Sequence, residues 1–546
     1  MAQEDRTTTP PVHWADQTAQ QIIARKGPVG GAKKHYTCAS GITPSGVIHI
    51  GNFREIISVE LVVRALRDAG EPVRFIYSWD NFDAFRKVPP NWPQPEMLAE
   101  HLRWPIVDVP DPYGETESYA RHNEVRIEKT MPEVGVEPEY LYQAPRYRAG
   151  DYAEGIKVAL ANRDVIRSIL DEHRTSPLPA DWWPVSIFSS FSNKDTTTIL
   201  NWDGKYGITY RCNETGQEET IDLRHTTLAK LLWRVDWPMR WAYEGVDFEP
   251  AGKEHHSAGG SFDTAKVIVE QVYHFEPPVT FKYDFISIKG QGGKISSSRG
   301  NLLSVDDVLE VYQPEVMRHL FAGTRPNAEF QISFDLDVIK LYEDYDRCER
   351  IYYGLEEVSE KRAAKERRNY ELSQVRPIHN PGGGSPDDAP LQVPFRTLSN
   401  YLMISAGDVD AALAMAPGFD AVSSPEVKAR LRRRAECAWN WITSYAPDDF
   451  RFELKTGDEE PVVLSADEIA AVSALRAEIE EGFDSHDEKT MAEAIYRIAN
   501  ETGVDQKRFF AVMYQVLVGK ERGPRLAGFL LTIGRQRVLD ILGRYT

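Results

Sequence analysis

The fold is decided by the stretch ASGITPSGVIHIGN, residues 39–52. It follows a short β-prone run at 35–39 and leads into a helical pattern over 48–68. A second apolar run at 73–79 comes after a Gly-Glu-Pro turn. The order strand, tight loop, helix, strand predicts a parallel sheet with a right-handed crossover, and ligands of such sheets bind at the carboxyl ends of the strands.

The loop itself has the composition of a phosphate site. It combines three glycines, a proline and hydroxyl side chains at a strand-to-helix junction, where free backbone N–H groups and the positive end of the helix dipole face an anion. His49 adds a donor that can be positioned. Gly51 has no side chain, so a flat base has room to stack against the backbone beside it.

The remaining sequence indicates several domains, because 546 residues exceed one ordinary hydrophobic core. Pro, Trp and Tyr are frequent over 105–219, which suits an insertion between two halves of the sheet. The alternation then resumes, with a helix, a strand and a polar Gly/Ser-rich loop expected at 261–273, 279–288 and 290–301. Beyond Asp335 the pattern is almost entirely helical, with amphipathic runs at 336–355, 426–445, 466–481, 489–503 and 526–543.

Composition describes an ordinary globular protein, with 42% hydrophobic and 27% charged residues. The start of the chain lacks a basic segment followed by an apolar run, and no stretch reaches about 18 apolar residues, so we expect a cytoplasmic protein without membrane association. A net charge of −19 argues against one broad basic surface for nucleic acid. Two basic runs, 361–368 and 428–434, are either solvated helix faces or phosphate contacts.

Two motifs now carry a family resemblance. Pro44-Ser45-Gly46 followed by His49-Ile50-Gly51-Asn52 resembles the HIGH signature of class I aminoacyl-tRNA synthetases, and the later loop Lys294-Ile295-Ser296-Ser297-Ser298 resembles their KMSKS signature. A mobile loop that carries a lysine and hydroxyls can close on a triphosphate and offset the charge of leaving pyrophosphate. Asn52 replaces the last histidine, and Ser297 replaces the second lysine, a charge that Arg299 can supply instead.

The resemblance implies ATP with Mg²⁺ as cofactors and a set of site residues. The implied catalytic residues are His49, Asn52, Lys294, Ser296, Ser297 and Ser298. The implied ATP-binding residues are Thr43, Pro44, Ser45, Gly46, His49, Gly51, Asn52, Lys294 and Arg299.

The amino acid is indicated by three tracts. Asp80 and Asp83 follow the second apolar run, where they can face a substrate ammonium. The tracts 86–89, 233–241 and 252–261 resemble class I lysyl-tRNA synthetases, which implies L-lysine and tRNA(Lys) as substrates and a lysine pocket formed by Gly41, Thr43, Trp233 and His255 beside the two aspartates. Glutamate as the amino acid, a nucleotidyltransferase that does not use tRNA and a catalytically silent tRNA-binding paralogue stay open.

The resemblance also implies a domain order. It divides an α/β, Rossmann-type parallel-sheet catalytic domain into halves at 1–104 and 220–301, around an inserted connective subdomain at 105–219. A helical region that contacts the tRNA stem follows at 302–360, and an all-α anticodon-binding domain at 361–546. Relatives often carry a zinc knuckle in the insertion. Here Cys212 stands alone where a pair is needed, so structural zinc is not expected.

Overall fold

The structure is a computed structural model that describes residues 11–290, 303–378, 382–457 and 459–545. Lys294, Ser296, Ser297, Ser298 and Arg299 lie outside the described residues. The chain divides into two compact units. The first comprises Met1–Val308, Pro314–Ile332 and Glu357–Gly383, and the second comprises Leu309–Gln313, Ser333–Glu356 and Gly384–Thr546. The boundary between the units does not fall at residue 360. The segment Ser333–Glu356 belongs to the second unit, and the segment Glu357–Gly383 that follows it belongs to the first.

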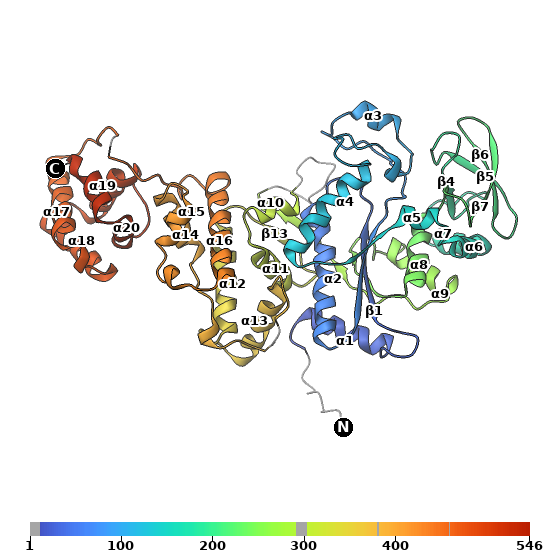
Figure 1. The fold of residues 1–546 in the computed structure, drawn as a ribbon, viewed down its shortest axis with the longest axis horizontal. Coiled ribbons are helices and arrows are strands. Elements are labelled where there is room, and N and C mark those ends of the chain that lie inside the picture. The colour runs from blue at the N-terminus through green and yellow to red at the C-terminus, as the bar shows by residue number, and fades with distance from the viewer. Residues whose placement is uncertain (1–10, 291–302, 379–381, 458, 546) are drawn as a thin grey trace, which may run out of the picture. The chain divides into compact units, whose positions relative to one another are not determined.

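A parallel four-stranded sheet forms the centre of the first unit and confirms the predicted α/β class. Its order is β3-β2-β1-β9, with β1 (Tyr36–Ile42) beside β2 (Val73–Trp79). The helix α2 (Ile50–Asp68) makes the expected crossover (Figure 1). Ile42 pairs with Trp79, which pairs with Tyr142 at the end of β3 (Glu139–Tyr142), so the carboxyl ends of these strands meet at one edge.

The second half of this unit adds short parallel pairs. The helices α8 (Trp233–Glu244) and α9 (Ser261–Gln271) flank β9 (Val246–Phe248) and β10 (Ala251–Gly252). The prediction of a single strand over 279–288 is wrong. The stretch forms two strands, β11 (Lys282–Tyr283) and β12 (Ile286–Ile288), because the first pairs with β10 and the second with β13 (Phe330–Ile332).

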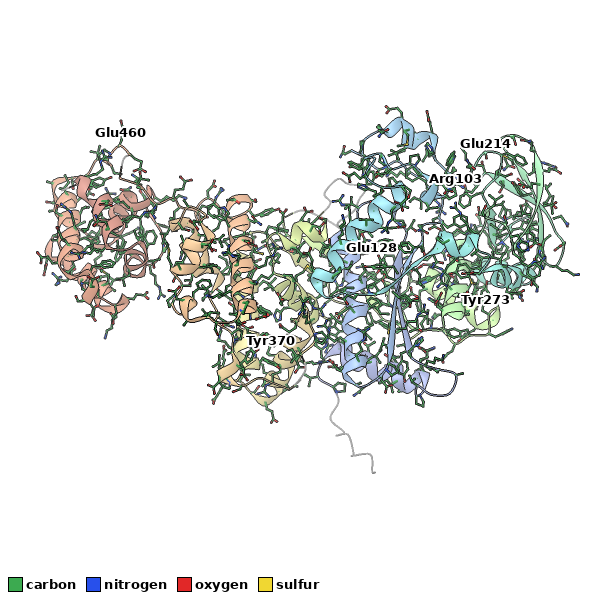
Figure 2. All side chains as sticks on the ribbon, in the orientation of Figure 1. Arg103, Glu128, Glu214, Tyr273, Tyr370 and Glu460 are labelled. Atoms are coloured by element: carbon green, nitrogen blue, oxygen red, sulfur yellow. The ribbon has the colours of Figure 1, made fainter. Side chains whose placement is uncertain are left out.

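The stretch 105–219 contains more than an insertion, since β3 belongs to the main sheet. The inserted strands form an antiparallel sheet of β5 (Thr197–Trp202), β6 (Gly207–Cys212) and β7 (Glu218–Asp222). Cys212 is buried at the end of β6, and Glu214 lies in the turn that follows (Figure 2). A further pair joins β4 (Val185–Ile187) and β8 (Ala229–Leu231). No group of three or more His, Cys, Asp or Glu among the described residues is placed to hold a metal ion.

Helices complete the first unit. They are α1 (Trp14–Lys26), α3 (Pro95–Glu100), α4 (Tyr119–Thr130), α5 (Gln143–Arg148), α6 (Ala153–Ala161), α7 (Arg163–Asp171), α10 (Val305–Leu309), which reaches the first residue of the second unit, α11 (Pro314–Gly323) and α13 (Glu360–Ser373). Among the described residues, no helix is long and apolar enough to cross a membrane.

Apart from the end of α10, the regular elements described in the second unit are all helices. Those expected at 336–355, 426–445, 466–481 and 489–503 are confirmed as α12 (Asp337–Tyr352), α16 (Pro425–Ser444), α17 (Ala466–Gly482) and α18 (Glu488–Glu501). The run 526–543 is not one helix, because it breaks at Gly534, whose φ of 90° favours glycine, into α20 (Leu526–Ile533) and α21 (Arg535–Leu542). The others are α14 (Phe395–Ile404), α15 (Val409–Ala414) and α19 (Gln506–Val518).

The basic run 428–434 is a solvated face only in part: Lys428 and Arg432 are exposed, whereas Arg430 and Arg434 are paired with carboxylates. Arg430 forms hydrogen bonds of 2.7 and 2.8 Å to Glu349, and Arg434 forms bonds of 2.6 and 2.9 Å to Asp346. Arg434 is only 1% exposed. These arginines therefore tie α16 to α12 inside the second unit.

Candidate functional site

The predicted strand-to-helix junction is built around the His49 side chain. His49 is the N-cap of α2, and its Nδ1 accepts a hydrogen bond from the backbone N–H of Gly51 at 3.1 Å. Asn52 completes a capping box by accepting from the His49 backbone N–H at 3.3 Å. Since Nδ1 is an acceptor here, neutral His49 carries its proton on Nε2, which is thus a donor.

Glycine is required at two positions of this edge. A Cβ on Gly41 would lie 2.7 Å from the backbone oxygen of Ser78, so β1 and β2 approach there as only glycine allows. A Cβ on Gly51 would lie 2.9 Å from the ring of His49. Gly51 thus makes room for the imidazole that caps the helix, a packing requirement that the sequence alone does not reveal.

Two adjoining pockets open at the carboxyl edge of the sheet. The first, called the cap pocket, is lined by Gly41, His49, Gly51, Asn52, Glu55, Tyr283 and their neighbours. The second, called the tryptophan pocket, is lined by Gly41, Glu55, Asp80, Trp233, Trp237, Glu249, His255 and their neighbours. Gly41 and Glu55 line both, as do Ser40 and His255, so the two pockets adjoin.

Three indoles from α8 form one wall of the tryptophan pocket. Trp233, Trp237 and Trp241 follow each other at a spacing of four residues, which places them on one helix face. Trp233 stacks on Trp237 with ring centroids 5.0 Å apart at an angle of 21°, and Trp237 lies 4.9 Å from Trp241. Trp233 is 36% exposed, so its ring still offers apolar surface to a ligand.

The tryptophan pocket is also lined by two carboxylates that form no ion pair with a described residue. Glu55 accepts hydrogen bonds from Ser40 Oγ at 2.7 Å and from Tyr283 Oη at 2.5 Å. Glu249 accepts from the indole N–H groups of Trp237 at 3.0 Å and Trp241 at 2.5 Å. Burial raises the pKa of Glu249 to about 7, and the nearby Glu55 carboxylate adds to that rise. Burial also raises the pKa of Glu55.

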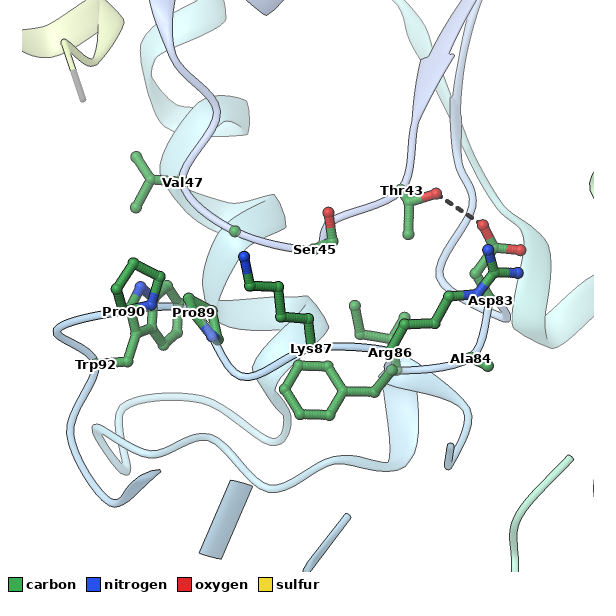
Figure 3. Close-up of a pocket in the computed structure, with 13 residues that line it drawn as sticks. Thr43, Ser45, Val47, Asp83, Ala84, Arg86, Lys87, Pro89, Pro90 and Trp92 are labelled. Carbon is green, nitrogen blue, oxygen red and sulfur yellow. Dashed lines mark hydrogen bonds between the residues drawn. The ribbon is translucent and has the colours of Figure 1, made fainter. Parts of the chain in front are cut away.

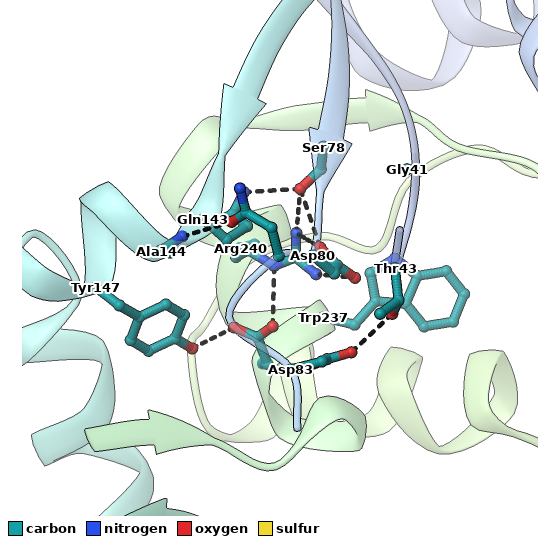
Figure 4. Close-up of polar contacts among 12 residues, drawn as sticks. Gly41, Thr43, Ser78, Asp80, Asp83, Gln143, Ala144, Tyr147, Trp237 and Arg240 are labelled. Carbon is teal, nitrogen blue, oxygen red and sulfur yellow. Dashed lines mark hydrogen bonds and ion pairs between the residues drawn. The ribbon is translucent and has the colours of Figure 1, made fainter. Parts of the chain in front are cut away.

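Asp80, in contrast, is already paired. It lies 2.7 Å from Arg240 of α8, whose guanidinium also contacts Ser78 and Asp236 (Figure 4). Ser78 in turn accepts from Gln143 at 2.7 Å. This network joins β2, α8 and the residue after β3.

Asp83 is also paired, and it lies outside the tryptophan pocket. Its carboxylate accepts from Thr43 Oγ1 at 2.7 Å and forms an ion pair with Lys230 at 2.5 Å. Burial opposes the ionisation of Asp83, but Lys230 outweighs it and holds the pKa of Asp83 below its ordinary value. Thr43 and Asp83 line a third pocket, which we call the basic pocket because it is also lined by Arg86 and Lys87 (Figure 3).

The predicted site residues therefore divide into three groups. Gly41, Asp80, Trp233 and His255 meet in the tryptophan pocket, while His49, Gly51 and Asn52 meet in the cap pocket, which Gly41 and His255 also line. Thr43, Ser45, Gly46 and Asp83 line the basic pocket, and Pro44 is buried beside it with its carbonyl 3.4 Å from Asn123 Nδ2. Lys294, Ser296, Ser297, Ser298 and Arg299 lie outside the described residues.

The sequence analysis did not identify Glu55 and Glu249, the carboxylates of the tryptophan pocket without an ion pair to a described residue, or Arg240 and Lys230, the cations that pair with Asp80 and Asp83. Glu249 directly follows β9, where the strand-end rule used for Asp80 would have found it. Glu55 lies in the first turns of α2, next to Arg54 and before the apolar run that starts at Ile56, which is a weaker signal. The pairing of Arg240 with Asp80 and of Lys230 with Asp83 joins positions about 150 residues apart (separations of 160 and 147), which no local pattern reveals.

Comparison with known proteins places these pockets in context. Residues 12–376 match the family model described as tRNA synthetases class I (K). The chain is 50% identical over 538 residues to a lysine–tRNA ligase of Treponema pallidum (strain Nichols), covering 98% of this chain and 99% of that protein. A lysine–tRNA ligase of Pyrococcus horikoshii is 39% identical over 542 residues, covering 97% and 99%. A solved glutamate tRNA ligase of Elizabethkingia meningosepticum covers 94% of the chain at 13% identity and a TM-score of 0.43.

Proposed function

The chain belongs to the class I tRNA synthetases of the lysine type and is a lysine–tRNA ligase, and from that premise we propose how its pockets divide the work. In the first step the lysine carboxylate attacks the α-phosphorus of ATP, and the bond to the β-phosphate breaks, so lysyl-adenylate forms and pyrophosphate leaves. In the second step a terminal ribose hydroxyl of tRNA(Lys) attacks the lysyl carbonyl and AMP leaves. Neither step needs a strong base, so positioning and charge stabilisation dominate.

The tryptophan pocket takes lysine in this proposal. The observation that carries it is the pair of carboxylates, Glu55 and Glu249, that form no ion pair with a described residue. Lysine brings two ammonium groups and can neutralise both, whereas glutamate would add a further negative charge. The exposed face of Trp233 suits the side-chain methylenes, and His255, held by Ser261 at 2.6 Å, supplies a polar contact.

This proposal moves ammonium recognition away from Asp80 and Asp83. Each aspartate already has an internal cation, Arg240 or Lys230. A carboxylate whose charge is balanced offers little net attraction to a second cation. Asp80 therefore shapes the wall of the lysine pocket through Arg240, and Asp83 fixes Thr43.

The cap pocket takes ATP. His49 Nε2 and the Asn52 amide donate to phosphate oxygens at the start of α2, where the helix dipole favours an anion. Mg²⁺ commonly binds through substrate phosphates, so it enters with ATP. Lys294 and Arg299, with the hydroxyls of Ser296, Ser297 and Ser298, bind the departing pyrophosphate in this scheme.

The two helical regions are proposed to hold the rest of the tRNA, the stem near 302–360 and the anticodon at 361–546. The substrates lysine, ATP and tRNA(Lys) meet in the cytoplasm, where we place the enzyme.

The test of lysine recognition replaces Glu55 by Gln, which removes the charge and keeps the shape. We expect the KM for lysine in pyrophosphate exchange to rise about 10- to 100-fold, because a charge-assisted hydrogen bond contributes about 1.5–3 kcal/mol, with the KM for ATP changing much less. Exchange is measured with and without tRNA.

The matched control is Glu270→Gln, which removes the same charge at an exposed position of α9. An unchanged KM for lysine in Glu55→Gln would overturn this assignment, while the absence of lysine-dependent exchange in the unaltered enzyme would overturn the function itself.

A further inference from the structure

The basic pocket adjoins the reaction centre but has no part in the scheme above. Thr43 lines it and directly follows Ile42, which lines the cap pocket. The turn of Ser45 and Gly46 forms one side of the basic pocket, and the segment from Asp83 to Trp92 forms the other. A ligand in this pocket would therefore lie one loop away from the phosphates of ATP.

Both sides of the pocket are firmly held. Tyr119 of α4 donates to the carbonyl of Ser45 at 2.8 Å. Phe85 is 1% exposed, receives a hydrogen bond at its carbonyl from the Arg103 N–H at 2.7 Å, and donates to the Trp104 carbonyl at 2.8 Å. The segment that carries the basic residues is thus anchored at Phe85, and the pocket does not depend on a freely moving loop.

The charge of the pocket is positive and unbalanced. Arg86 and Lys87 are both exposed, and neither forms a hydrogen bond or ion pair with a described residue, although Arg86 lies near enough to Asp195 to lower the pKa of that carboxyl against the effect of burial. Two adjacent cations without partners stand out in a chain whose net charge is −19. They suit an anion with more than one charged oxygen.

The pocket also offers an aromatic surface. Trp92 lines it, is only partly buried, and lies 4.7 Å from the ring of Tyr119. Cations next to a partly accessible aromatic ring are the features with which proteins bind single-stranded nucleic acid, because phosphates contact the cations and a base stacks on the ring.

We propose that the basic pocket binds the single-stranded 3′ end of the tRNA, with Arg86 and Lys87 on its backbone phosphates and Trp92 against a base. This inference rests on the proposed function, because only an enzyme that esterifies the terminal ribose must bring that strand to the edge of the cap pocket. The pocket then orients the terminal nucleotide toward the adenylate.

The experiment compares two RNAs on the full-length enzyme. The double variant Arg86→Ala/Lys87→Ala is titrated with intact tRNA(Lys) and with the same tRNA lacking its last three nucleotides, at several salt concentrations. We expect affinity for intact tRNA to fall about tenfold and affinity for truncated tRNA to change less than twofold. The slope of log affinity against log salt should become shallower by about 1.4, or about 0.7 for each lost contact on a single strand.

The matched control is Lys34→Ala/Lys205→Ala, which removes the same charge at two exposed positions away from the pocket. Equal losses for intact and truncated tRNA would overturn the proposal, as would a raised KM for ATP with unchanged tRNA affinity, because the anion would then be the ATP phosphates. If the unaltered enzyme fails to charge tRNA with lysine, the proposed function fails instead. Unchanged circular dichroism of the variant excludes misfolding.

Discussion

The pKa of Glu249 depends on its burial, its hydrogen bonds and the charge of a bound ligand. Its carboxylate is fixed by two indole N–H groups, yet those neutral donors do not balance a full charge in a buried position. The result is a pKa of about 7, which leaves the free enzyme about half protonated at that pH. A bound ammonium would favour the ionised form.

Lysine affinity should therefore depend on pH. Below pH 7 Glu249 is protonated and must lose its proton before it can pair with an ammonium, so affinity falls as pH falls through about 7 and levels off above it. We expect calorimetry between pH 5.5 and 8.5 to show a decrease approaching tenfold per pH unit below 7.

The comparison variant for that measurement is Glu249→Gln. It should bind lysine weakly at all pH values and show a flatter profile, because it has no proton to lose. A profile for Glu249→Gln that keeps the full slope would assign the pH dependence to another group.

Individual residues also mark the limit of sequence reasoning at the site. Gly41, His49 and Trp233 could be predicted because their motif fixes both residue type and location. Asp80 was placed correctly at a strand end, but its pairing with Arg240 was not predicted, since Arg240 comes from a helix 160 positions away in sequence. Charge balance is a property of the assembled pocket, and a local pattern does not contain it.

At the scale of elements, the buried Arg54 joins α2 to the loops that precede β12 and β13. Arg54 is 2% exposed and donates to the carbonyls of Phe285, Arg325, Pro326 and Ala328 at 2.7–3.2 Å. Burial lowers the pKa of Arg54 to about 10. Since α2 carries both His49 and Glu55, this contact also fixes the two main pockets.

Replacing Arg54 by Met should remove the Arg54 donor from all four carbonyls while filling much of the volume, although the carbonyls of Arg325 and Pro326 keep backbone donors. We expect the opening free energy of α2 to fall by about 2–4 kcal/mol, because each buried unsatisfied group costs about 1–3 kcal/mol. Hydrogen exchange followed by mass spectrometry on peptides from α2 measures this directly. The control is Arg67→Met, at an exposed position of the same helix, which should change exchange little.

Elements with strong periodicity were predictable, and their interruptions were not. The order β1, α2, β2 and the long helices of the second unit follow from hydrophobic spacing. The division of 279–288 into β11 and β12 depends on different pairing partners, and β3 is a four-residue strand in irregular surroundings. The break at Gly534 had a local signal, a glycine within the apolar run, that the amphipathic pattern outweighed.

For the whole molecule, a charge of −19 has the same sign as the tRNA it must bind. Long-range attraction should therefore contribute little to association, even though local cations hold the bound complex. We expect the association rate constant, measured by stopped-flow fluorescence with labelled tRNA, to stay within about 10⁵–10⁷ M⁻¹s⁻¹ and to change less than threefold between 200 and 50 mM salt. Dissociation should slow over the same range.

A variant with Glu100, Glu137 and Glu172 replaced by Gln tests the cause. All three are exposed, and neutralising them should raise the association rate at low salt with little change in lysine activation. An association rate in the unaltered enzyme that climbs more than tenfold on lowering salt would contradict the prediction.

The arginines of α16 have a consequence for how such enzymes are recognised in genomes. Arg430 and Arg434 help to make the run 428–434 one of the most basic segments of the chain. Arg430 is nevertheless paired with Glu349, and Arg434 with Asp346, so both join α16 to α12. A search that scores RNA binding by the density of positive residues along the sequence would select this segment and pass over the isolated pair Arg86 and Lys87. Annotation of acidic synthetases should therefore count cations only after subtracting those that the fold has already neutralised.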